Sequence, residues 1–472
     1  MKTREEFVDE VAAYIEHPLK ADQEKALQEV YTFLFNGGAN SSFILRGYAG
    51  TGKTTLMGGL IRWFHSVNRK TVLLAPTGRS AKVLAEHSGF PASTIHRRIY
   101  AVKDDGFGRM AMQLGLNKSE KTIFIVDEAS MIGEMNPSDG MYSRSLIEDL
   151  ISYVQSGTRC RLIFVGDSAQ LPPIGLEMSP ALLKKRLASF TRASVFEAEL
   201  TEVVRQASES LILENATKIR QLIARSAFNE FGIAVDRYRD VSEVDNYDLE
   251  DLLSSFYQSE SSNESIIICR SNKNANAFNF QIRGRILDRE ETIEAGDRLM
   301  IVKNNYFWKL PGKRQNFLAN GDMIYVERVN ARYEFDPFRF AEVEVSFLGE
   351  EGQSFSLILL LNTLDHEGAN IGSREIKKMR EALIDADVID ANDPEEKFFQ
   401  NPYFHAVQVK YAYAVTCHKS QGGQWENVLI YHGYFTDEMM DKSYLRWMYT
   451  AVTRASEKLY LVGFPPQFLI SN

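Results

Sequence analysis

Short apolar runs that end in polar residues or glycine recur along the first half of the chain. They lie at 42–45, 71–75, 122–126 and 161–165. Between the first three runs, apolar residues recur at helical spacing, and two further helical pieces, broken at His17 and Pro18, precede them. Runs that are apolar throughout are typical of strands buried on both faces of a parallel sheet. The pattern predicts an α/β domain whose ligand lies beyond the carboxyl ends of its strands.

The second half of the chain repeats this pattern with an interruption. Apolar runs of the same kind lie at 265–269, 411–415, 428–431 and 458–462. From about 296 to 361, strand-like segments follow one another without helical spacing, which is typical of a small all-β barrel. A charged helix is expected at 373–385, followed by an acidic stretch. The sequence therefore predicts a second α/β domain that contains an inserted β module.

The expected domain limits follow from these changes of pattern. The first α/β domain is 1–225, with a β-hairpin insertion at about 97–118. The second α/β domain is formed by 226–296 and 405–472, and the inserted β module is 297–404. Phe107 is expected at the tip of the hairpin, where an ordinary surface turn is the alternative interpretation.

Composition limits the class of protein. The 472 residues, 44% of them hydrophobic, are enough for two to four domains with sizeable cores. A net charge of −9 argues against a protein coated in positive charge, so any nucleic acid must be held by a local basic channel. Cys160, Cys269 and Cys417 form no CxxC pair, which indicates neither a zinc site nor a disulfide framework. This cysteine usage fits a reducing cytoplasm. No segment approaches the about 18 consecutive apolar residues of a membrane span, so we expect a soluble cytoplasmic protein.

A glycine-rich segment between the first strand and the next helix carries the main chemical signal. Strand, loop and helix come in the order that a phosphate cradle needs, and a turn without a ligand would require all three to coincide by chance. Lys53 would reach the β- and γ-phosphates, and the Thr54 hydroxyl would bind Mg²⁺. The predicted nucleotide-binding residues of this loop are Gly47, Gly50, Thr51, Gly52, Lys53, Thr54 and Thr55.

Further candidates lie beyond the other strands. Asp127 would bind Mg²⁺ and Glu128 would orient or deprotonate the attacking water, although alone this pair would be read as a solvated strand end. Gln170 is a neutral amide suited to sensing the γ-phosphate. Arg205 and Arg454 would stabilise transition-state charge, but spacing alone does not distinguish them from surface arginines.

Together these stretches resemble the superfamily 1 helicases, specifically the B branch with the RecD-like and phage Dda-like enzymes. The resemblance runs from Gln23 to about Gly463, with the motifs in the family order. It implies that Gln23 reads the adenine and that Arg205 and Arg454 are arginine fingers. It also implies contacts to DNA, mainly to phosphates, by residues of four motif segments: Pro76, Thr77, Lys82, His96, Asn272, Thr416 and His418.

The resemblance also implies a fold and an activity. The two α/β domains would be RecA-like P-loop motor domains, the hairpin a small 1B domain with Phe107 as the strand-separation pin, and the β module an SH3-like 2B domain. ATP and Mg²⁺ would be the cofactors, and single-stranded DNA and junctions of single- and double-stranded DNA the partners of a monomer, with DNA repair or replication proteins as possible further partners. Translocation would run from 5′ to 3′, a direction that no residue indicates by itself. The short hairpin, the charged helix and the acidic stretch depart from the family pattern.

Two other functions are compatible with parts of the pattern. The chain would be a nucleic-acid-stimulated ATPase that remodels protein–DNA complexes without unwinding, or one that acts on RNA. Alternatively, it would be a regulatory subunit that binds nucleotide only as a structural ligand. The complete set of catalytic candidates argues against this last alternative.

Overall fold

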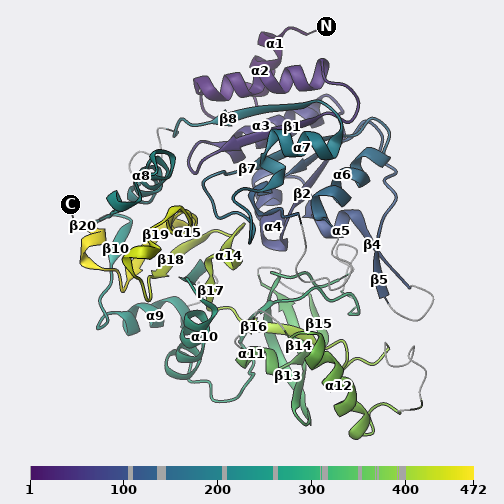
Figure 1. Ribbon diagram of the computed structural model, residues 1–472, viewed down its shortest axis with the longest axis vertical. Coiled ribbons are helices and arrows are strands. Elements are labelled where there is room, and N and C mark those ends of the chain that lie inside the picture. Colours follow the sequence, from purple (N-terminus) through teal and green to yellow (C-terminus); the bar gives the residue numbers. More distant parts are fainter. Residues whose placement is uncertain are drawn as a thin grey trace.

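The computed structural model has two parallel sheets and a closed barrel (Figure 1). It describes residues 2–104, 110–134, 145–204, 210–258, 264–308, 310, 317–348, 353–366, 368, 371–390, 392 and 400–471. Among these residues, no helix combines the length and the apolar character needed to cross a membrane. All three cysteines are buried and free.

The first sheet is parallel throughout, in the order β3-β2-β6-β7-β1-β8. Its strands are β1 (Ser42–Gly47), β2 (Thr71–Ala75), β3 (Ala92–Thr94), β6 (Ile123–Val126), β7 (Arg161–Gly166) and β8 (Val195–Leu200). The helices between them are α3 (Lys53–Ser66), α4 (Gly78–Ser88), α5 (Ile95–Ile99), α6 (Leu146–Ser156) and α7 (Lys184–Thr191). Because β6, β7 and β1 are neighbours, the loops that follow them meet at one edge of the sheet.

Two N-terminal helices, α1 (Arg4–Ala12) and α2 (Ala21–Phe35), cover this sheet. Phe7 of α1 and Leu27 and Phe33 of α2 share a core with Phe43 and Leu45 of β1. This packing holds the start of α2, and with it Gln23, beside the loop that follows β1.

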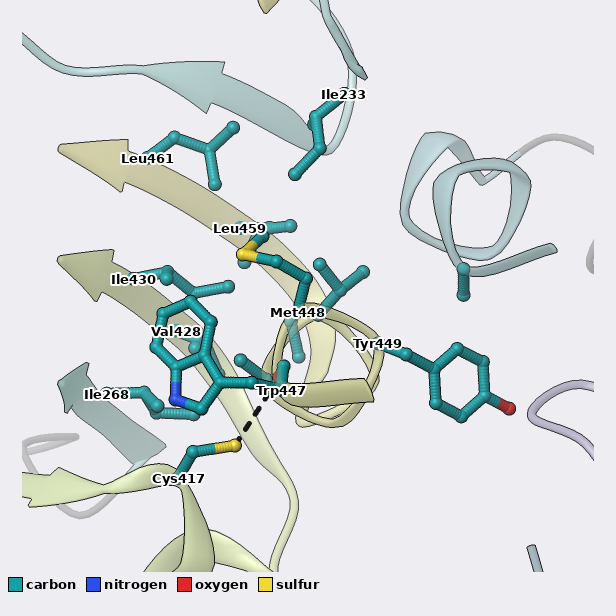
Figure 2. Packing of buried hydrophobic residues seen from close by; sticks show 14 of the residues in the cluster. Ile233, Ile268, Cys417, Val428, Ile430, Trp447, Met448, Tyr449, Leu459 and Leu461 are labelled. Carbon is teal, nitrogen blue, oxygen red and sulfur yellow. Dashed lines mark hydrogen bonds between the residues drawn. The ribbon is translucent and has the colours of Figure 1, made fainter. Parts of the chain in front are cut away.

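The second sheet is also parallel, in the order β10-β19-β18-β11-β17. Its strands are β10 (Val241–Glu243), β11 (Ser265–Cys269), β17 (Ala414–Thr416), β18 (Trp425–Tyr431) and β19 (Ala455–Val462). The helices with it are α8 (Leu211–Arg225), α9 (Leu249–Tyr257), α10 (Asn272–Gln281), α14 (Cys417–Ser420) and α15 (Lys442–Val452), and β9 (Ile233–Val235) pairs with β20 (Leu469–Ser471). Figure 2 shows Trp447 and Met448 of α15 packed over strands β18 and β19.

The barrel closes in the order β12-β13-β14-β15-β16. Its strands are β12 (Arg298–Ile301), β13 (Met323–Phe335), β14 (Phe338–Phe347), β15 (Ser354–Leu360) and β16 (Val407–Tyr411), of which β15 and β16 are parallel. The short α11 (Asn362–Asp365) follows β15, and α12 (Ser373–Asp385) lies where a charged helix was expected. Met379 and Leu383 of α12 share a hydrophobic cluster with Phe340 and Leu360 of the barrel, so the helix packs against the barrel.

These sheets and the barrel confirm the predicted fold class. Two segments nevertheless pack on the other side of the predicted domain limits. Helix α8 lies before residue 226, yet its Leu211 and Ile219 share a core with Leu459 of the second sheet. Strand β16 lies after residue 404, yet it closes the barrel. In both cases long-range burial, which local pattern does not reveal, decides the packing partner.

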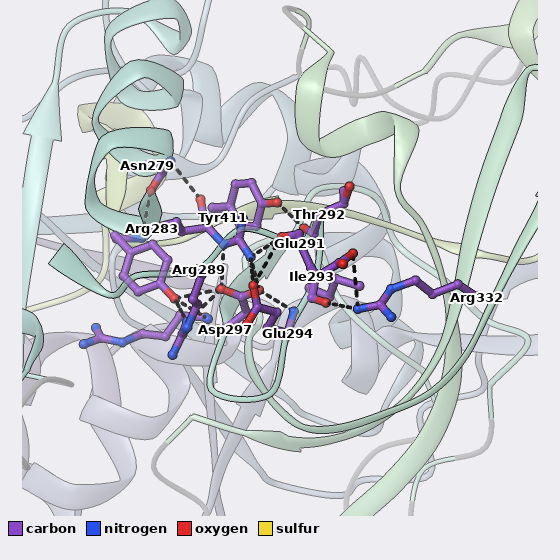
Figure 3. Close-up of polar contacts among 12 residues, drawn as sticks. Asn279, Arg283, Arg289, Glu291, Thr292, Ile293, Glu294, Asp297, Arg332 and Tyr411 are labelled. Carbon is purple, nitrogen blue, oxygen red and sulfur yellow. Dashed lines mark hydrogen bonds and ion pairs between the residues drawn. The ribbon is translucent and has the colours of Figure 1, made fainter. Parts of the chain in front are cut away.

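A buried ion network joins the second sheet to the barrel (Figure 3). Asp297, fully buried just before β12, accepts hydrogen bonds from Arg283 Nε and Arg289 Nη1 at 2.8 Å each. Tyr413 Oη donates to the same carboxylate at 3.1 Å. A buried carboxylate is tolerated only when its oxygens are satisfied in this way. The network fixes the direction in which the chain enters the barrel.

The predicted hairpin is present as β4 (Tyr100–Asp104) and β5 (Met110–Leu114), paired antiparallel with Tyr100 opposite Leu114. Phe107, the predicted pin, lies outside the described residues. Its role therefore stays a prediction.

Candidate nucleotide site and nucleic-acid interface

The loop between β1 and α3 has the tight backbone of a phosphate cradle. Gly50 and Gly52 have φ angles of +74° and +77°, in the left-handed region that glycine adopts without strain. A Cβ at Gly52 would lie 2.7 Å from Gln23 Nε2, and one at Gly47 would lie 2.7 Å from Lys53 Cγ. The loop ends at the first residue of α3, so the helix N-terminus faces the same space. These features fit a bound nucleotide phosphate chain.

Two residues that are predicted to contact the nucleotide form hydrogen bonds with the loop itself. Lys53 Nζ donates to the Tyr48 carbonyl at 2.9 Å and lies 3.9 Å from Asp167 Oδ2. Gln23, which is 6% exposed, donates through Nε2 to the Thr51 carbonyl at 3.0 Å. Gln23 thus supports the loop directly, while its contact to adenine stays a prediction.

Asp127 and Glu128 follow β6 at the same edge of the sheet. Asp127 Oδ1 accepts from the Glu128 N–H at 2.9 Å. Glu128 has a φ of +51°, an uncommon conformation for a residue other than glycine and one that concentrates at functional sites. Burial and then the neighbouring Glu128 charge raise the pKa of Asp127 to about 6. A cation beside this carboxylate would favour its ionised form.

A cavity of about 400 Å³ brings some of the predicted site residues of the two domains together. Thr54, Thr55, Asp127 and Glu128 of the first domain line it, and so does Arg454 from the end of α15 in the second. A hydroxyl and a carboxylate are the oxygen ligands that Mg²⁺ prefers alongside substrate phosphates, so this donor set fits that ion. No cluster of three or more His, Cys, Asp or Glu suited to a metal occurs in the described parts of the chain.

Arg454 is oriented by the protein around it. Its guanidinium donates to the carbonyls of Thr450 and Gly423, both at 3.0 Å, and to Thr453 Oγ1 at 3.2 Å. Gln170, which follows β7, is buried and accepts from Ser130 Oγ at 3.4 Å. Arg205 falls outside the described residues, so its role as an arginine finger stays a prediction.

The predicted DNA-binding loops of the two domains meet. Thr77 follows Pro76 and caps α4, accepting from the Ser80 N–H at 3.2 Å. Gly422, after α14, approaches so closely that a Cβ there would lie 2.8 Å from Ser80 Cβ. The two loops therefore touch across the domain boundary.

The other predicted DNA contacts are spread around these loops. Lys82 is exposed on α4 and pairs with Glu86 at 3.9 Å. His96 is half-buried, and burial lowers its pKa to about 4, so it is neutral at pH 7. Asn272 and His418 are exposed, and Thr416 is half-buried at the start of α14. Their contact to DNA stays a prediction.

Sequence reasoning missed several residues that link the domains. Arg79 stacks on Trp425 with 3.7 Å between its guanidinium carbon and the ring centroid, and donates to the Gln424 carbonyl at 2.8 Å. Lys419 donates to Asn320 Oδ1 of the barrel at 2.7 Å, and burial lowers its pKa to about 8. Arg79 and Lys419 lie inside recognised motif segments, but nothing in the sequence indicated their partners.

Two protein families match the chain. An AAA domain matches residues 18–246, and a UvrD-like helicase C-terminal domain matches residues 411–462. The first contains the phosphate loop, Asp127, Glu128 and Gln170, and the second contains Arg454. The match to the AAA domain and the geometry of its loop make the first domain a nucleotide-binding domain.

Similar proteins cover different shares of the chain. An uncharacterized protein of Methanocaldococcus jannaschii is 24% identical over 93% of this chain and 38% of its own length. The ATP-dependent RecD2 DNA helicase of Deinococcus radiodurans is 32% identical over 37% of this chain and 21% of its own length. The ATP-dependent DNA helicase dda of Enterobacteria phage T4 is 26% identical over 61% of this chain and 63% of its own length.

The chain thus spans less than two thirds of each of these relatives. The domain matches nevertheless fall on both predicted α/β domains, and two of the relatives come from the two groups that the motifs resemble. The resemblance that the motifs predict is confirmed: the chain is similar to the RecD2 and dda helicases and matches a UvrD-like helicase C-terminal domain.

Proposed function

We propose that the chain is an ATP-dependent DNA helicase that moves from 5′ to 3′ along single-stranded DNA and unwinds duplexes. The observation that carries this proposal is the shared cavity, in which Arg454 of the second domain lies with Thr54 and Asp127 of the first. An arginine supplied across a domain boundary makes the rate of hydrolysis depend on the relative position of the two domains, as a motor requires.

Each catalytic group has a defined task in this proposal. Lys53 binds the β- and γ-phosphates, and Glu128 orients or deprotonates the attacking water. Thr54 and Asp127 would hold Mg²⁺, which would supply charge neutralisation at the phosphates when bound. Gln170 senses the γ-phosphate, and Arg205 and Arg454 stabilise the charge that develops during transfer.

The joined loops around Thr77 and Gly422 give the nucleic acid a path across both domains. Because hydroxyls, amides and backbone groups there would contact phosphates, binding would not depend on base sequence. Opening and closing of the nucleotide cleft would change the distance between the two loops, and the single strand would advance with each cycle. We expect a monomer to suffice.

The test is ATP hydrolysis with and without single-stranded DNA or RNA, combined with strand displacement on duplexes that carry a 5′ or a 3′ tail. DNA-stimulated hydrolysis with displacement of only the 5′-tailed duplex supports the proposal. Stimulation without displacement favours a translocase that remodels protein–DNA complexes, and stronger stimulation by RNA favours an RNA-directed enzyme. A chain that binds nucleotide without hydrolysing it would be a regulatory subunit.

A further inference from the structure

The hydroxyl of Tyr449, on α15 of the second domain, reaches into the nucleotide site of the first. Tyr449 Oη donates to Asp167 Oδ2 at 2.6 Å and accepts from the Ala49 N–H of the phosphate loop at 2.8 Å. The side chain is 1% exposed. Its ring is part of the same buried cluster as Trp447 and Met448, and Figure 2 shows it pointing to the other side of the helix from theirs. None of the predicted site residues includes it.

The hydroxyl keeps its proton in this position. Burial and then the neighbouring Asp167 charge raise the pKa of Tyr449 well above its ordinary value. With a single proton, the hydroxyl donates to the carboxylate and leaves a lone pair for the Ala49 N–H. Both partners are thereby satisfied, and a hydrogen bond to a charged carboxylate is among the stronger kinds.

Asp167 extends this contact to the catalytic lysine. Its Oδ1 accepts from the Ala169 N–H at 2.9 Å, which orients the carboxylate, and its Oδ2 lies 3.9 Å from Lys53 Nζ. Asp167 is 1% exposed, so water does not replace a lost partner. One hydroxyl of the second domain therefore bonds the phosphate loop and the carboxylate beside its lysine.

Neighbouring contacts fix the helix that carries Tyr449. The Leu171 N–H donates to Thr450 Oγ1 at 2.8 Å, and Gln421 Nε2 donates to the Leu171 carbonyl at 2.7 Å. Arg454 follows at the end of the same helix. A shift of α15 relative to the first domain would therefore change Tyr449 and Arg454 together.

We propose that Tyr449 is a positioning residue that ties Ala49 and Asp167 to α15, so that the phosphate loop, Lys53 and Arg454 are aligned for ATP hydrolysis. This inference rests on the proposed function of the site. Loss of the hydroxyl would remove a partner of the buried Asp167 carboxylate and of the Ala49 N–H, and alignment would suffer more than nucleotide affinity.

The test compares Tyr449→Phe with Tyr444→Phe. Tyr444 is a matched control because it is equally buried on α15, but its hydroxyl contacts His432 Nε2 at 2.7 Å, within the second domain. We expect Tyr449→Phe to lower kcat for ATP hydrolysis about tenfold or more with KM for ATP changed less than about threefold. Tyr444→Phe should stay within about twofold of the wild type in both.

A double-mutant cycle with Asp167→Asn distinguishes an effect that acts through the Tyr449–Asp167 hydrogen bond from a non-specific destabilisation of the site. If the two residues act through one hydrogen bond, the effect of Tyr449→Phe on kcat will be much smaller in the Asp167→Asn background than in the wild type. The proposal is overturned if the effects on kcat multiply independently, if KM alone changes, or if Tyr449→Phe and Tyr444→Phe are equally impaired.

The same measurements distinguish this inference from the proposed function. A wild-type chain that hydrolyses ATP without stimulation by DNA refutes the helicase, and basal turnover of Tyr449→Phe still decides the role of Tyr449. If the wild type hydrolyses no ATP with any nucleic acid, both proposals fail.

Discussion

The substitution Gly52→Ala tests whether the conformation of the phosphate loop is what binds the nucleotide. An alanine at a φ of +77° costs about 1–2 kcal/mol, because its Cβ crowds the following carbonyl. Its Cβ would also lie 2.7 Å from Gln23 Nε2, so the glutamine would move and lose its bond to the Thr51 carbonyl, worth about 1 kcal/mol. The total is about 2–3 kcal/mol.

This cost is specific to the cradle conformation, so the loop should relax into another one. Nucleotide affinity is then expected to fall about 30- to 150-fold, because each 1.4 kcal/mol is a factor of ten. The assay is titration with a fluorescent, non-hydrolysable ATP analogue in the presence of Mg²⁺.

Gly89→Ala is the matched control for this substitution. Gly89 also has a φ of +77°, at the end of α4, but a Cβ there would meet no atom within 4 Å. The Gly89→Ala variant should lose stability only through the strained backbone conformation, and its nucleotide affinity should stay within about twofold of the wild type. Equal affinities of Gly52→Ala and Gly89→Ala would refute the reasoning, because they would mean that the loop tolerates the crowding.

Three further predictions concern catalysis, strand separation and pH. Lys53→Ala should abolish ATP hydrolysis, since the positive charge at the β- and γ-phosphates is lost; near-normal turnover would remove the loop from the mechanism. Phe107→Ala should reduce unwinding more than DNA-stimulated ATP hydrolysis, and an equal fall of both activities, or no change in either, would rule out a pin. Burial lowers the pKa of His432 to about 4, whereas an unfolded histidine titrates near about 6.5, so the unfolded chain binds more protons between these values. The free energy of unfolding should therefore fall by up to about 3 kcal/mol as the pH drops from about 6.5 to 4. Urea unfolding at a series of pH values measures this dependence, and His432→Gln should reduce it. An unchanged pH dependence in the variant would contradict the prediction.

Local pattern was sufficient to predict the elements that carry the chemistry. Strand β1, the phosphate loop and α3 are contiguous in the sequence, so their residue types alone specify the order of strand, turn and helix. Asp127 was predictable for the same reason, because it directly follows an apolar strand. Their meeting at one sheet edge then follows from the parallel arrangement.

Contacts between distant segments were not predictable in this way. Tyr449 and Asp167 are 282 residues apart, and the stacking of Arg79 on Trp425 joins segments of different domains. The same holds for α8 and β16, whose own patterns fit a helix and a strand but do not specify which core they join. Tertiary burial selects the partner in each case, and a single sequence carries no signal for it.

The contacts of Arg454 explain how a catalytic arginine can be both oriented and available. A guanidinium has five N–H donors, and three protein oxygens accept from Arg454 through its Nε, Nη1 and Nη2 atoms. These bonds hold the plane of the group at the cavity that Thr54 and Asp127 also line, and they leave donors for a phosphate oxygen. Because the orientation is fixed before the substrate binds, closure of the cleft has only to bring the group nearer, which limits the entropy lost at that step. Arg454→Lys should therefore lose most of the rate that Arg454→Ala loses, since an ammonium keeps the charge but cannot make the three bonds that aim it.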